Sequence, residues 1–501
     1  MNPTKAPARR KYFAISGCSI FLFLAFLIFL SARWFVNVYG RIGFDSILYT
    51  LSSSLGGVEP ELLIKYLLGA LLPALLTTAL VIWLAFFCPR RKNGKYHRPA
   101  VGSSAIWICI LLSLMLIVAG AFDCGLVEYV TDLYSDTPLY ETYYVDPASV
   151  KITFPAQKRN LVYIMLESME TSYLSKELGG AMEKNLIPEL YALAEGNICF
   201  SDSKRDVGGF HTTAGATWTI GSMVAQTAGI PLKTPTEDVN KYGSDGEPFL
   251  PGVTTLTDIL HENGYYQALM VGSDVRFGGR KVYFEQHGMD EILDLYTARR
   301  DGIIPKDYFV WWGMEDLHLF EYAKEKLTEI SSNEQPFAFT MLTVDTHHVG
   351  GYQCELCTAS DSGETYDQSI SCSSRQVAEF VDWIKDQPFY ENTTVIIVGD
   401  HESMDNGYFQ RMVDEDYQRM MYNCFINSAV TTKRVHNRQW AAVDLFPTTL
   451  ASLGAAIEGN RLGLGTNLFS NQITLCEKYG FENFNDELGK SSDYYEEHFW
   501  K

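Results

Sequence analysis

Three long apolar stretches near the N-terminus constrain this 501-residue chain more than any other feature of its sequence. They are Tyr12–Leu30, Leu62–Cys88 and Ala105–Ala121, and Lys65 is the one Lys, Arg, Asp or Glu within them. Each stretch is close to the roughly 20 residues that a helix needs to cross the hydrocarbon core of a bilayer. The sequence therefore predicts an N-terminal bundle of three transmembrane helices ahead of a polar body.

Basic residues flanking these stretches predict the orientation in the membrane. Lys5–Lys11 contains four Lys or Arg residues, and Pro89–Ala100 contains five. Lys and Arg concentrate in cytoplasmic loops, so the N-terminus and the second loop are expected inside the cell. A cleaved signal peptide is the alternative for the first stretch, but Arg33-Trp34 directly after it makes a poor cleavage site. Three spans then place everything after about Asp123 outside the cell.

The charge distribution separates the membrane part from the body. Up to Cys124 the chain has 12 basic and 4 acidic residues, whereas the remainder has 28 basic and 56 acidic residues. This acidic balance excludes a protein that coats nucleic acid. We expect a membrane domain over 1–124, a polar, Tyr-rich linker over 125–159, the main extracytoplasmic domain over 160–481, and an acidic, aromatic, peripheral segment over 482–501.

The body alternates apolar, β-branched runs with amphipathic ones. The expected strands are Leu161–Leu166, Tyr265–Val271, Phe337–Val344 and Thr394–Val398, and the expected helices are Ile187–Ala194, Thr254–Glu262, Glu315–Ile330, Ser374–Ile384 and Asp444–Leu453. This alternation is typical of an α/β fold with a mostly parallel sheet and flanking helices. In such sheets, functional sites form beyond the carboxyl ends of the strands.

Polar side chains follow three of the expected strands at that end. Glu167 follows the first, Asp400-His401 follow the last, and Asp345 with His347 follows the third. Any one of these residues alone is more often a helix cap or a surface group. Together they offer carboxylate oxygens and imidazole nitrogens, which suit one divalent ion such as Mn²⁺, Mg²⁺ or Zn²⁺.

A segment rich in glycine and small residues, Gly208–Ile220, leads into an apolar run that reaches Ala228. Free backbone N–H groups at the start of a helix form an anion site. A threonine there can be an N-cap, or a nucleophile when a metal lowers the pKa of its hydroxyl. Spacing alone does not choose among the threonines of the segment, which are Thr212, Thr213, Thr217 and Thr219.

Three cysteines lie in a polar stretch of the body, namely Cys354, Cys357 and Cys372. A single C-x-x-C pair with no matching histidines is a weak indication of zinc. Outside the cell, a disulfide from one member of the pair to Cys372 is the favoured interpretation, and it leaves one thiol unexplained.

Several of these motifs together resemble the lipoteichoic acid synthase and MdoB-like phosphoglycerol transferase family of the sulfatase/alkaline phosphatase superfamily. The resemblance runs in the family's order from about Asn160 to Phe469. The matching segments are Asn160–Ser168, the stretch around Thr217, Gly272–Arg280, Tyr283–Asp290, Trp312–Asp316, Val398–His401 and Arg461–Gly465.

The resemblance implies a sulfatase-like catalytic domain and assigns roles to particular residues. Glu167, Asp400 and His401 would be metal ligands, with Mn²⁺ the favoured ion. Thr217 would be the fourth ligand and the nucleophile, because the family's reactive threonine opens a helix whose apolar run ends in Gly-Ile-Pro, here at 229–231. His347 would contact the transferred phosphate. Its imidazole is also a candidate general acid for the departing or entering oxygen.

Arg280 matches the basic residue that holds the lipid headgroup in the family. The aromatic residue usually found before this arginine is replaced here by Gly278-Gly279. The implied activity is transfer of phosphoglycerol from phosphatidylglycerol to an envelope glycan or a teichoic-acid-like acceptor through a phospho-threonine. A phosphoethanolamine transferase, or a phosphodiesterase or sulfatase-type hydrolase, is the alternative on the same metal site.

Overall fold

The computed structural model describes residues 6–40, 43–44, 47–48, 60–88, 90–92, 95–97, 103–233, 248–360 and 362–501. Lys5 and Arg98, two of the basic residues that predict the orientation, lie outside these ranges. The chain forms two compact units, one of residues 1–44 and 55–131 and one of residues 45–54 and 132–501.

The first unit contains three helical segments that are long and apolar enough to cross a membrane, namely Phe13–Tyr39, Leu63–Phe87 and Ser104–Asp123. They belong to α1 (Ala6–Tyr39), to α3 (Pro60–Tyr66) continued by α4 (Leu72–Ile82), and to α5 (Ser103–Asp123). π-helical turns at Leu67–Leu71 and Trp83–Phe87 lengthen the second segment. The prediction of three apolar helices is confirmed.

Contacts within this unit join α1 to both α4 and α5. A small core that includes Cys18, Leu22, Phe86 and Cys109 fills the space between the helices. Most other large apolar side chains of the three segments point outward, as expected of helices surrounded by lipid. A short hairpin of β1 (Arg90–Lys92) and β2 (Lys95–His97) connects the second helix to the third, and α6 (Leu126–Leu133) follows α5.

The second unit is built on a seven-stranded sheet of order β5-β10-β9-β4-β8-β6-β7. The strands are β4 (Asn160–Leu166), β5 (Gly209–Phe210), β6 (Tyr266–Val271), β7 (Glu291–Leu293), β8 (Phe337–Leu342), β9 (Thr393–Gly399) and β10 (Met421–Ile426). The five strands from β9 to β7 pair in parallel. β10 pairs antiparallel with β9 and with β5. The predicted α/β fold with a mostly parallel sheet is confirmed.

Helices cover both faces of this sheet, and β4 shows why. Its residues alternate between two cores: Leu161, Tyr163 and Met165 pack into one, and the intervening residues pack into the other. Such a strand reads as a continuous apolar run because neither face meets water. The helices over the first core are α9 (Thr219–Ala228), α11 (Leu256–Glu262), α12 (Arg280–Gln286) and α17 (Leu445–Ser452).

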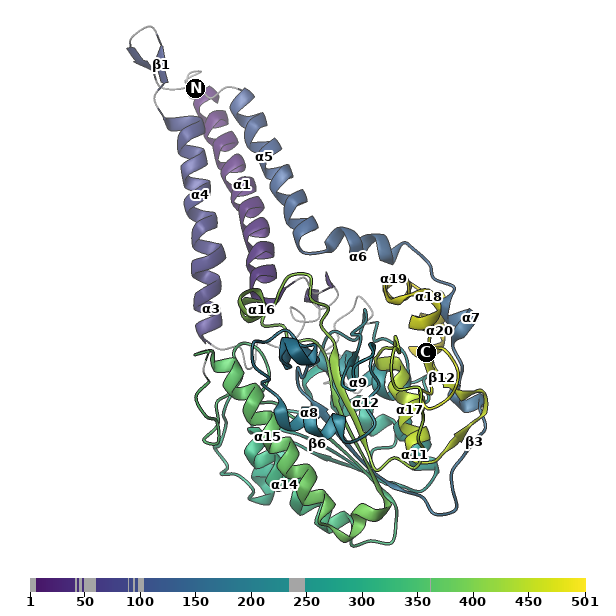
Figure 1. Ribbon diagram of the computed structural model, residues 1–501. Helices are drawn as coiled ribbons and strands as arrows, with labels where there is room; N and C mark the ends of the chain where they lie inside the picture. The colour runs from purple at the N-terminus through teal and green to yellow at the C-terminus, as the bar shows by residue number, and fades with distance from the viewer. Residues whose placement is uncertain are drawn as a thin grey trace. The chain divides into compact units, whose positions relative to one another are not determined.

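The second core lies under α8 (Pro188–Glu195), α13 (Leu295–Asp301), α14 (Asp316–Ile330), α15 (Thr365–Lys385) and α16 (Asn406–Met412). Figure 1 shows α14 and α15 side by side on their face of the sheet. Since α15 spans 365–385, the predicted helix over 374–384 is ten residues too short, nine of them at its N-terminal end. Buried polar residues such as Asp367 and Ser369 conceal the helical periodicity of its first turns.

Residues 132–159 of the expected linker and the whole expected peripheral segment are structured parts of the second unit. Within 125–159, α7 (Leu139–Tyr143) is partly buried and β3 (Ile152–Thr153) pairs with β11 (Ala456–Ile457). The C-terminal helices are α18 (Leu475–Tyr479), α19 (Phe481–Gly489) and α20 (Asp493–Phe499). Phe484 and Phe499 are buried in the first core, so a peripheral position for 482–501 is wrong. The acidic residues lie on the exposed sides of amphipathic helices whose aromatic sides face inward.

Candidate active site at the carboxyl ends of the central strands

The site begins where two neighbouring parallel strands end. β4 and β9 pair with Leu166 opposite Gly399, so the residues that follow them, Glu167 and Asp400, emerge at the same edge of the sheet. Asp400 N donates to Leu166 O at 3.0 Å, which keeps the two strand ends together. A Cβ on Gly399 would lie 2.1 Å from Met169 O. Only glycine allows the chain to pass this close and deliver Asp400 to the site.

Hydrogen bonds fix both carboxylates. Ser168, which has a left-handed φ of 52°, donates its backbone N–H to Asp400 Oδ1 at 2.7 Å. Its hydroxyl donates to Glu167 Oε1 at 2.9 Å. His401 N donates to Asp400 Oδ1 at 2.6 Å, whereas the other oxygen, Oδ2, is buried with no hydrogen-bond partner among the described residues. One carboxylate oxygen of Asp400 is thus held by the protein, and the other is directed into the site.

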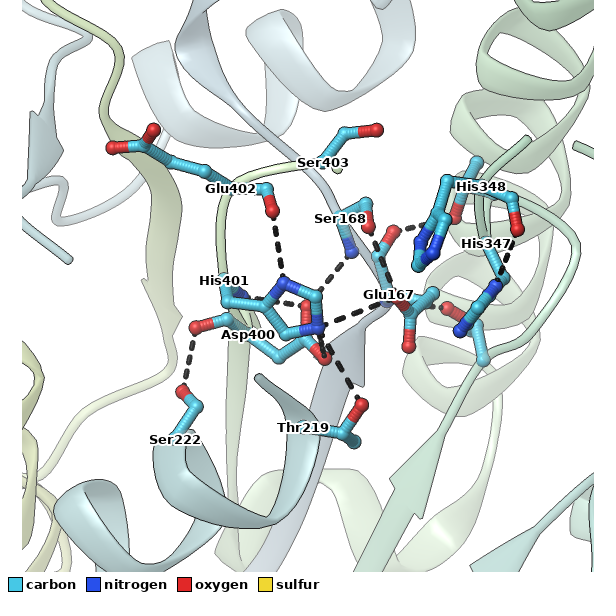
Figure 2. Close-up of polar contacts among 12 residues, drawn as sticks. Glu167, Ser168, Thr219, Ser222, His347, His348, Asp400, His401, Glu402 and Ser403 are labelled. Atoms are coloured by element: carbon cyan, nitrogen blue, oxygen red, sulfur yellow. Dashed lines mark hydrogen bonds and ion pairs between the residues drawn. The ribbon is translucent and has the colours of Figure 1, made fainter. Parts of the chain in front are cut away.

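The imidazole of His401 completes a cluster of three groups. Its Nδ1 lies 2.9 Å from Glu402 O, and because a carbonyl only accepts, Nδ1 must carry the proton. In the neutral ring, Nε2 is then a lone pair that faces Glu167 Oε1 at 3.5 Å and Asp400 Oδ2 at 3.4 Å. Figure 2 shows these side chains converging. A lone pair facing two carboxylates is favourable only when positive charge lies between them.

Both carboxylates are buried, which increases the need for a positive charge beside them: Glu167 is 2% exposed and Asp400 is 1% exposed. Burial raises the pKa of Glu167, and the neighbouring Asp400 raises it further, while the charge of Arg280 opposes the shift. Burial likewise raises the pKa of Asp400. One oxygen or nitrogen from each of Glu167, Asp400 and His401 lies within 4.8 Å of the others, a set that could hold one metal ion. Two carboxylates and an imidazole with a free nitrogen are a donor set that fits a divalent cation.

The helix α9 presents a hydroxyl to this cluster. α9 begins at Thr219, and Trp218 before it is extended. The Thr219 hydroxyl lies 3.4 Å from His401 Nε2, and Ser222, one turn along, donates to Asp400 O at 2.5 Å. Figure 2 shows both residues directed from the helix toward the cluster. Thr217 is half-buried and lies in the loop on the other side of Trp218. Thr219, two residues beyond the predicted Thr217, thus brings its hydroxyl into contact with His401.

His347 and Arg280 approach from other elements. His347 follows β8, is partly buried, and its Nδ1 lies 2.7 Å from His348 O, so Nδ1 donates and Nε2 carries the lone pair. Burial lowers the pKa of His347 to about 4, the hydrogen bond to His348 O opposes the shift, and the positive charge of Arg280 acts in the same direction as burial. His347 is therefore a neutral imidazole at pH 7, able to accept a proton rather than to donate one as a general acid.

Arg280 is the first residue of α12 and is 5% exposed. Its guanidinium donates to Phe277 O at 3.1 Å, to Ser273 Oγ at 3.1 Å and to Asp274 O at 2.7 Å, which fixes its position. The preceding glycines have φ values of 69° and 76°, and a Cβ on Gly279 would lie 2.8 Å from the ring of Phe249. The glycine pair in place of the family's aromatic residue is thus required by the backbone here.

Supporting groups that sequence reasoning missed are Ser168, Ser222, Glu170 and Arg419. Glu170 accepts hydrogen bonds from Ser403 N at 2.8 Å and from Arg419 Nε at 2.8 Å, and so secures the loop that carries His401. Ser168 directly follows the predicted ligand Glu167 in the sequence, and this adjacency could have identified it as a hydrogen-bond donor to that ligand. Arg419 is remote in sequence from every motif, and nothing local indicates its role.

Comparison with known proteins agrees with this architecture. The family model described as Sulfatase matches residues 159–455, more than half of the chain. The chain therefore belongs to the sulfatase family. It is 31% identical over 437 residues to "Phosphoglycerol transferase I" of Salmonella choleraesuis, covering 85% of this chain and 53% of that protein. It is also 31% identical over 386 residues to the protein of that name in Escherichia fergusonii, covering 75% and 47%.

These relatives confirm the resemblance to the phosphoglycerol transferases, and the chain spans about half of their length. Among solved structures, a lipoteichoic acid synthase, LtaP, from Listeria monocytogenes has a TM-score of 0.48 at 19% identity, covering 64% of this chain and 79% of the other. A lipooligosaccharide phosphoethanolamine transferase, EptA, from Neisseria meningitidis has a TM-score of 0.47 at 14% identity, covering 87% and 84%. The fold and the family together define a sulfatase-family α/β protein, and its chain also contains three helices that are long and apolar enough to cross a membrane.

Proposed function

We propose that this protein transfers phosphoglycerol from phosphatidylglycerol to a cell-envelope glycan or a teichoic-acid-like acceptor. The observation that carries the proposal is the Thr219 hydroxyl at the start of α9, 3.4 Å from His401 Nε2 and beside two buried carboxylates. The curated relatives named phosphoglycerol transferase I support the choice of headgroup.

A divalent ion held by Glu167, Asp400, His401 and Thr219 fits the donor set. Mn²⁺ is the favoured ion, and Mg²⁺ or Zn²⁺ would suit the same oxygen and nitrogen donors. Such an ion lowers the pKa of a hydroxyl bound to it and offsets the charge of a phosphate. It would also remove the repulsion between the two carboxylates and the lone pair of His401.

Thr219 is the proposed nucleophile, in place of Thr217. Its Oγ attacks the phosphorus of the lipid in line, so that an Oγ–P bond forms and the bond from phosphorus to the diacylglycerol oxygen breaks. Diacylglycerol leaves with a proton and phosphoglycerol remains on Thr219. An acceptor hydroxyl then attacks the same phosphorus, the Oγ–P bond breaks, and Thr219 regains its proton.

His347 and Arg280 are the proposed substrate-binding residues. With Nδ1 bonded to His348 O, the Nε2 of His347 is available to take the proton of the incoming acceptor hydroxyl. Arg280 contributes a fixed positive charge, since three hydrogen bonds hold its guanidinium. Losing one such stabilising donor costs about 10²–10³ in rate in comparable sites.

The membrane helices fit a lipid substrate. We assign residues 1–124 to a multi-pass membrane domain with a cytoplasmic N-terminus, and residues 160–481 to an extracytoplasmic catalytic domain. The assignment rests on the basic flanks of the apolar stretches and on the three helices that could cross a bilayer. Anchoring would hold the domain near a phosphodiester at the bilayer surface.

Turnover of headgroup-labelled lipid by the full-length protein in detergent tests the proposal. Thr219→Ala is expected to abolish release of diacylglycerol from phosphatidylglycerol, and Thr219→Ser to retain part of it, whereas Thr217→Ala leaves it active. Phosphatidylethanolamine as the better donor would favour the phosphoethanolamine transferase. Free glycerophosphate as the product with every acceptor tried would indicate the hydrolase. Full activity in Thr219→Ala would remove that residue from its role.

A further inference from the structure

A second group of potential metal ligands lies outside the proposed active site. The Sγ atoms of Cys354, Cys357 and Cys372 all lie within 4.8 Å of one another. Cys354 and Cys357 belong to the segment between β8 and α15, and Cys372 lies within α15. Cys354 is 7% exposed, Cys372 is 1% exposed, and Cys357 is partly exposed. The cluster is thus largely enclosed, with one thiol that solvent can reach.

We propose that these three cysteines bind a soft divalent ion, zinc above all, as a second and structural metal site. The distances from Cys354 Sγ are 3.8 Å to Cys357 Sγ and 3.7 Å to Cys372 Sγ. Two thiolates bound at about 2.3 Å to a tetrahedral zinc lie about 3.8 Å apart. A disulfide would require about 2.0 Å between two of them. The separations match the edges of a zinc–thiolate tetrahedron.

The use of all three thiols also favours an ion. A disulfide from Cys354 to either neighbour would leave the third sulfur unused, close to the bonded pair. One ion takes all three at once, because soft thiolate ligands select zinc. In the part of the chain that the structure describes, no fourth His, Cys, Asp or Glu side chain joins this group. Water would therefore complete the tetrahedron on the side of Cys357.

The surroundings resemble the outer shell of a thiolate site. Cys357 N donates to Cys354 O at 3.1 Å, which closes the C-x-x-C segment into a turn. Gln376, one turn after Cys372 on α15, places its amide nitrogen 3.4 Å from Cys372 Sγ. Arg375 donates to Leu356 O at 2.8 Å and brings a positive charge to the turn. An N–H donor and a cation offset the excess negative charge of three thiolates around one divalent ion.

The site would secure the segment that carries His347. That segment is already tied to α15 by Gln353, whose side chain donates to Ser369 Oγ at 2.9 Å, and by Ser369, which donates to Tyr352 O at 2.9 Å. An ion shared by Cys354, Cys357 and Cys372 would add a further link between the same two elements. This role does not depend on the reaction that the protein catalyses.

Metal analysis of full-length protein in detergent tests the proposal. Asp400→Asn removes a proposed ligand of the active-site ion, so zinc that remains in this variant belongs to the cysteines. We expect about one zinc per chain in Asp400→Asn and close to none in Asp400→Asn/Cys357→Ser. Cys357 is chosen because it is the most exposed of the three and its replacement disturbs packing least.

Cobalt gives a readout that the carboxylate and histidine site lacks. After chelation and reloading with Co²⁺, the wild-type protein and Asp400→Asn should both show thiolate-to-cobalt charge-transfer absorption, and Cys357→Ser should not. The thiols of Cys354, Cys357 and Cys372 should become reactive to an alkylating agent only after chelation. Either of two results in wild-type protein prepared with the alkylating agent present would overturn the proposal: a disulfide between two of the three cysteines, or three reactive thiols with no bound ion.

Discussion

Replacing Arg419 by Met tests whether a buried charge pair holds the loop that carries His401. The side chain of Glu170 is fully buried and accepts hydrogen bonds from Arg419 Nε at 2.8 Å and from Arg419 Nη2. The same carboxylate accepts from Ser403 N at 2.8 Å. Because Ser403 lies two residues after His401, the pair connects the end of β4 to the loop after β9.

The structure sets the expected loss of stability. Removing one partner of a buried pair costs about 3–5 kcal/mol, because the remaining charge stays buried without its counterpart. The Arg419 side chain is 20% exposed, so water can reach Glu170 in the variant and the lower limit of about 3 kcal/mol applies. Arg419 also lies over the ring of Phe409, 3.5 Å from its centroid, and Met preserves much of that apolar contact.

Thermal unfolding of the full-length protein in detergent measures the effect. At about 2 °C per kcal/mol for a unit of this size, Arg419→Met should lower Tm by roughly 6 °C. Arg411→Met is the matched control, because Arg411 pairs with Glu364 while 56% exposed and such pairs contribute about 0–1 kcal/mol. Glu170→Gln/Arg419→Met should recover most of the loss. Equal Tm values for Arg419→Met and Arg411→Met would refute the reasoning.

Three further predictions concern the active site, the loss of stability at acid pH and the C-terminal helices. Ser168→Ala removes the hydroxyl that donates to Glu167 and should weaken Mn²⁺ binding by about 10–100-fold, as measured by manganese titration. Burial lowers the pKa of His211 to about 4, so the unfolded chain binds that proton more tightly and stability is lost as pH falls from about 6.5 to about 4. His211→Phe should reduce this loss by about 3 kcal/mol when the free energy of unfolding is measured across that pH range. An unchanged loss of stability at acid pH would mean that His211 does not cause it. Phe499→Ala should cost about 3–5 kcal/mol, against no measurable loss for Tyr134→Ala at 89% exposure, and equal losses would mean that the C-terminal helix is not part of the core.

Strands buried on both faces could be predicted from the sequence, because every residue of 161–166 in β4 and of 395–398 in β9 meets a core. β10 could not, since Asn423 interrupts its apolar run. That side chain is buried because it bonds both backbone groups of Phe200, which lies far away in the chain. Polar residues satisfied by remote partners thus conceal a strand from any local pattern.

The candidate site likewise contains residues whose meeting could be predicted from the sequence and residues whose roles could not. Glu167, Asp400 and His401 follow strands, and strand ends meet at one edge of a parallel sheet, so their meeting could be predicted. The choice between Thr217 and Thr219 depends on the residue at which α9 begins, and helix boundaries are uncertain by one or two residues in sequence. The tie from Glu170 to Arg419 joins residues 249 positions apart, and no sequence motif marks it.

The central claim is that Thr219 carries phosphoglycerol during turnover. Full-length protein incubated with phosphatidylglycerol, without acceptor, and quenched in acid should yield a peptide with about 154 Da added to Thr219. The adduct should be lost on addition of the acceptor and be missing from Thr219→Ala. The same mass on Thr217, or turnover with an unmodified Thr219 peptide at every time point, would contradict the account.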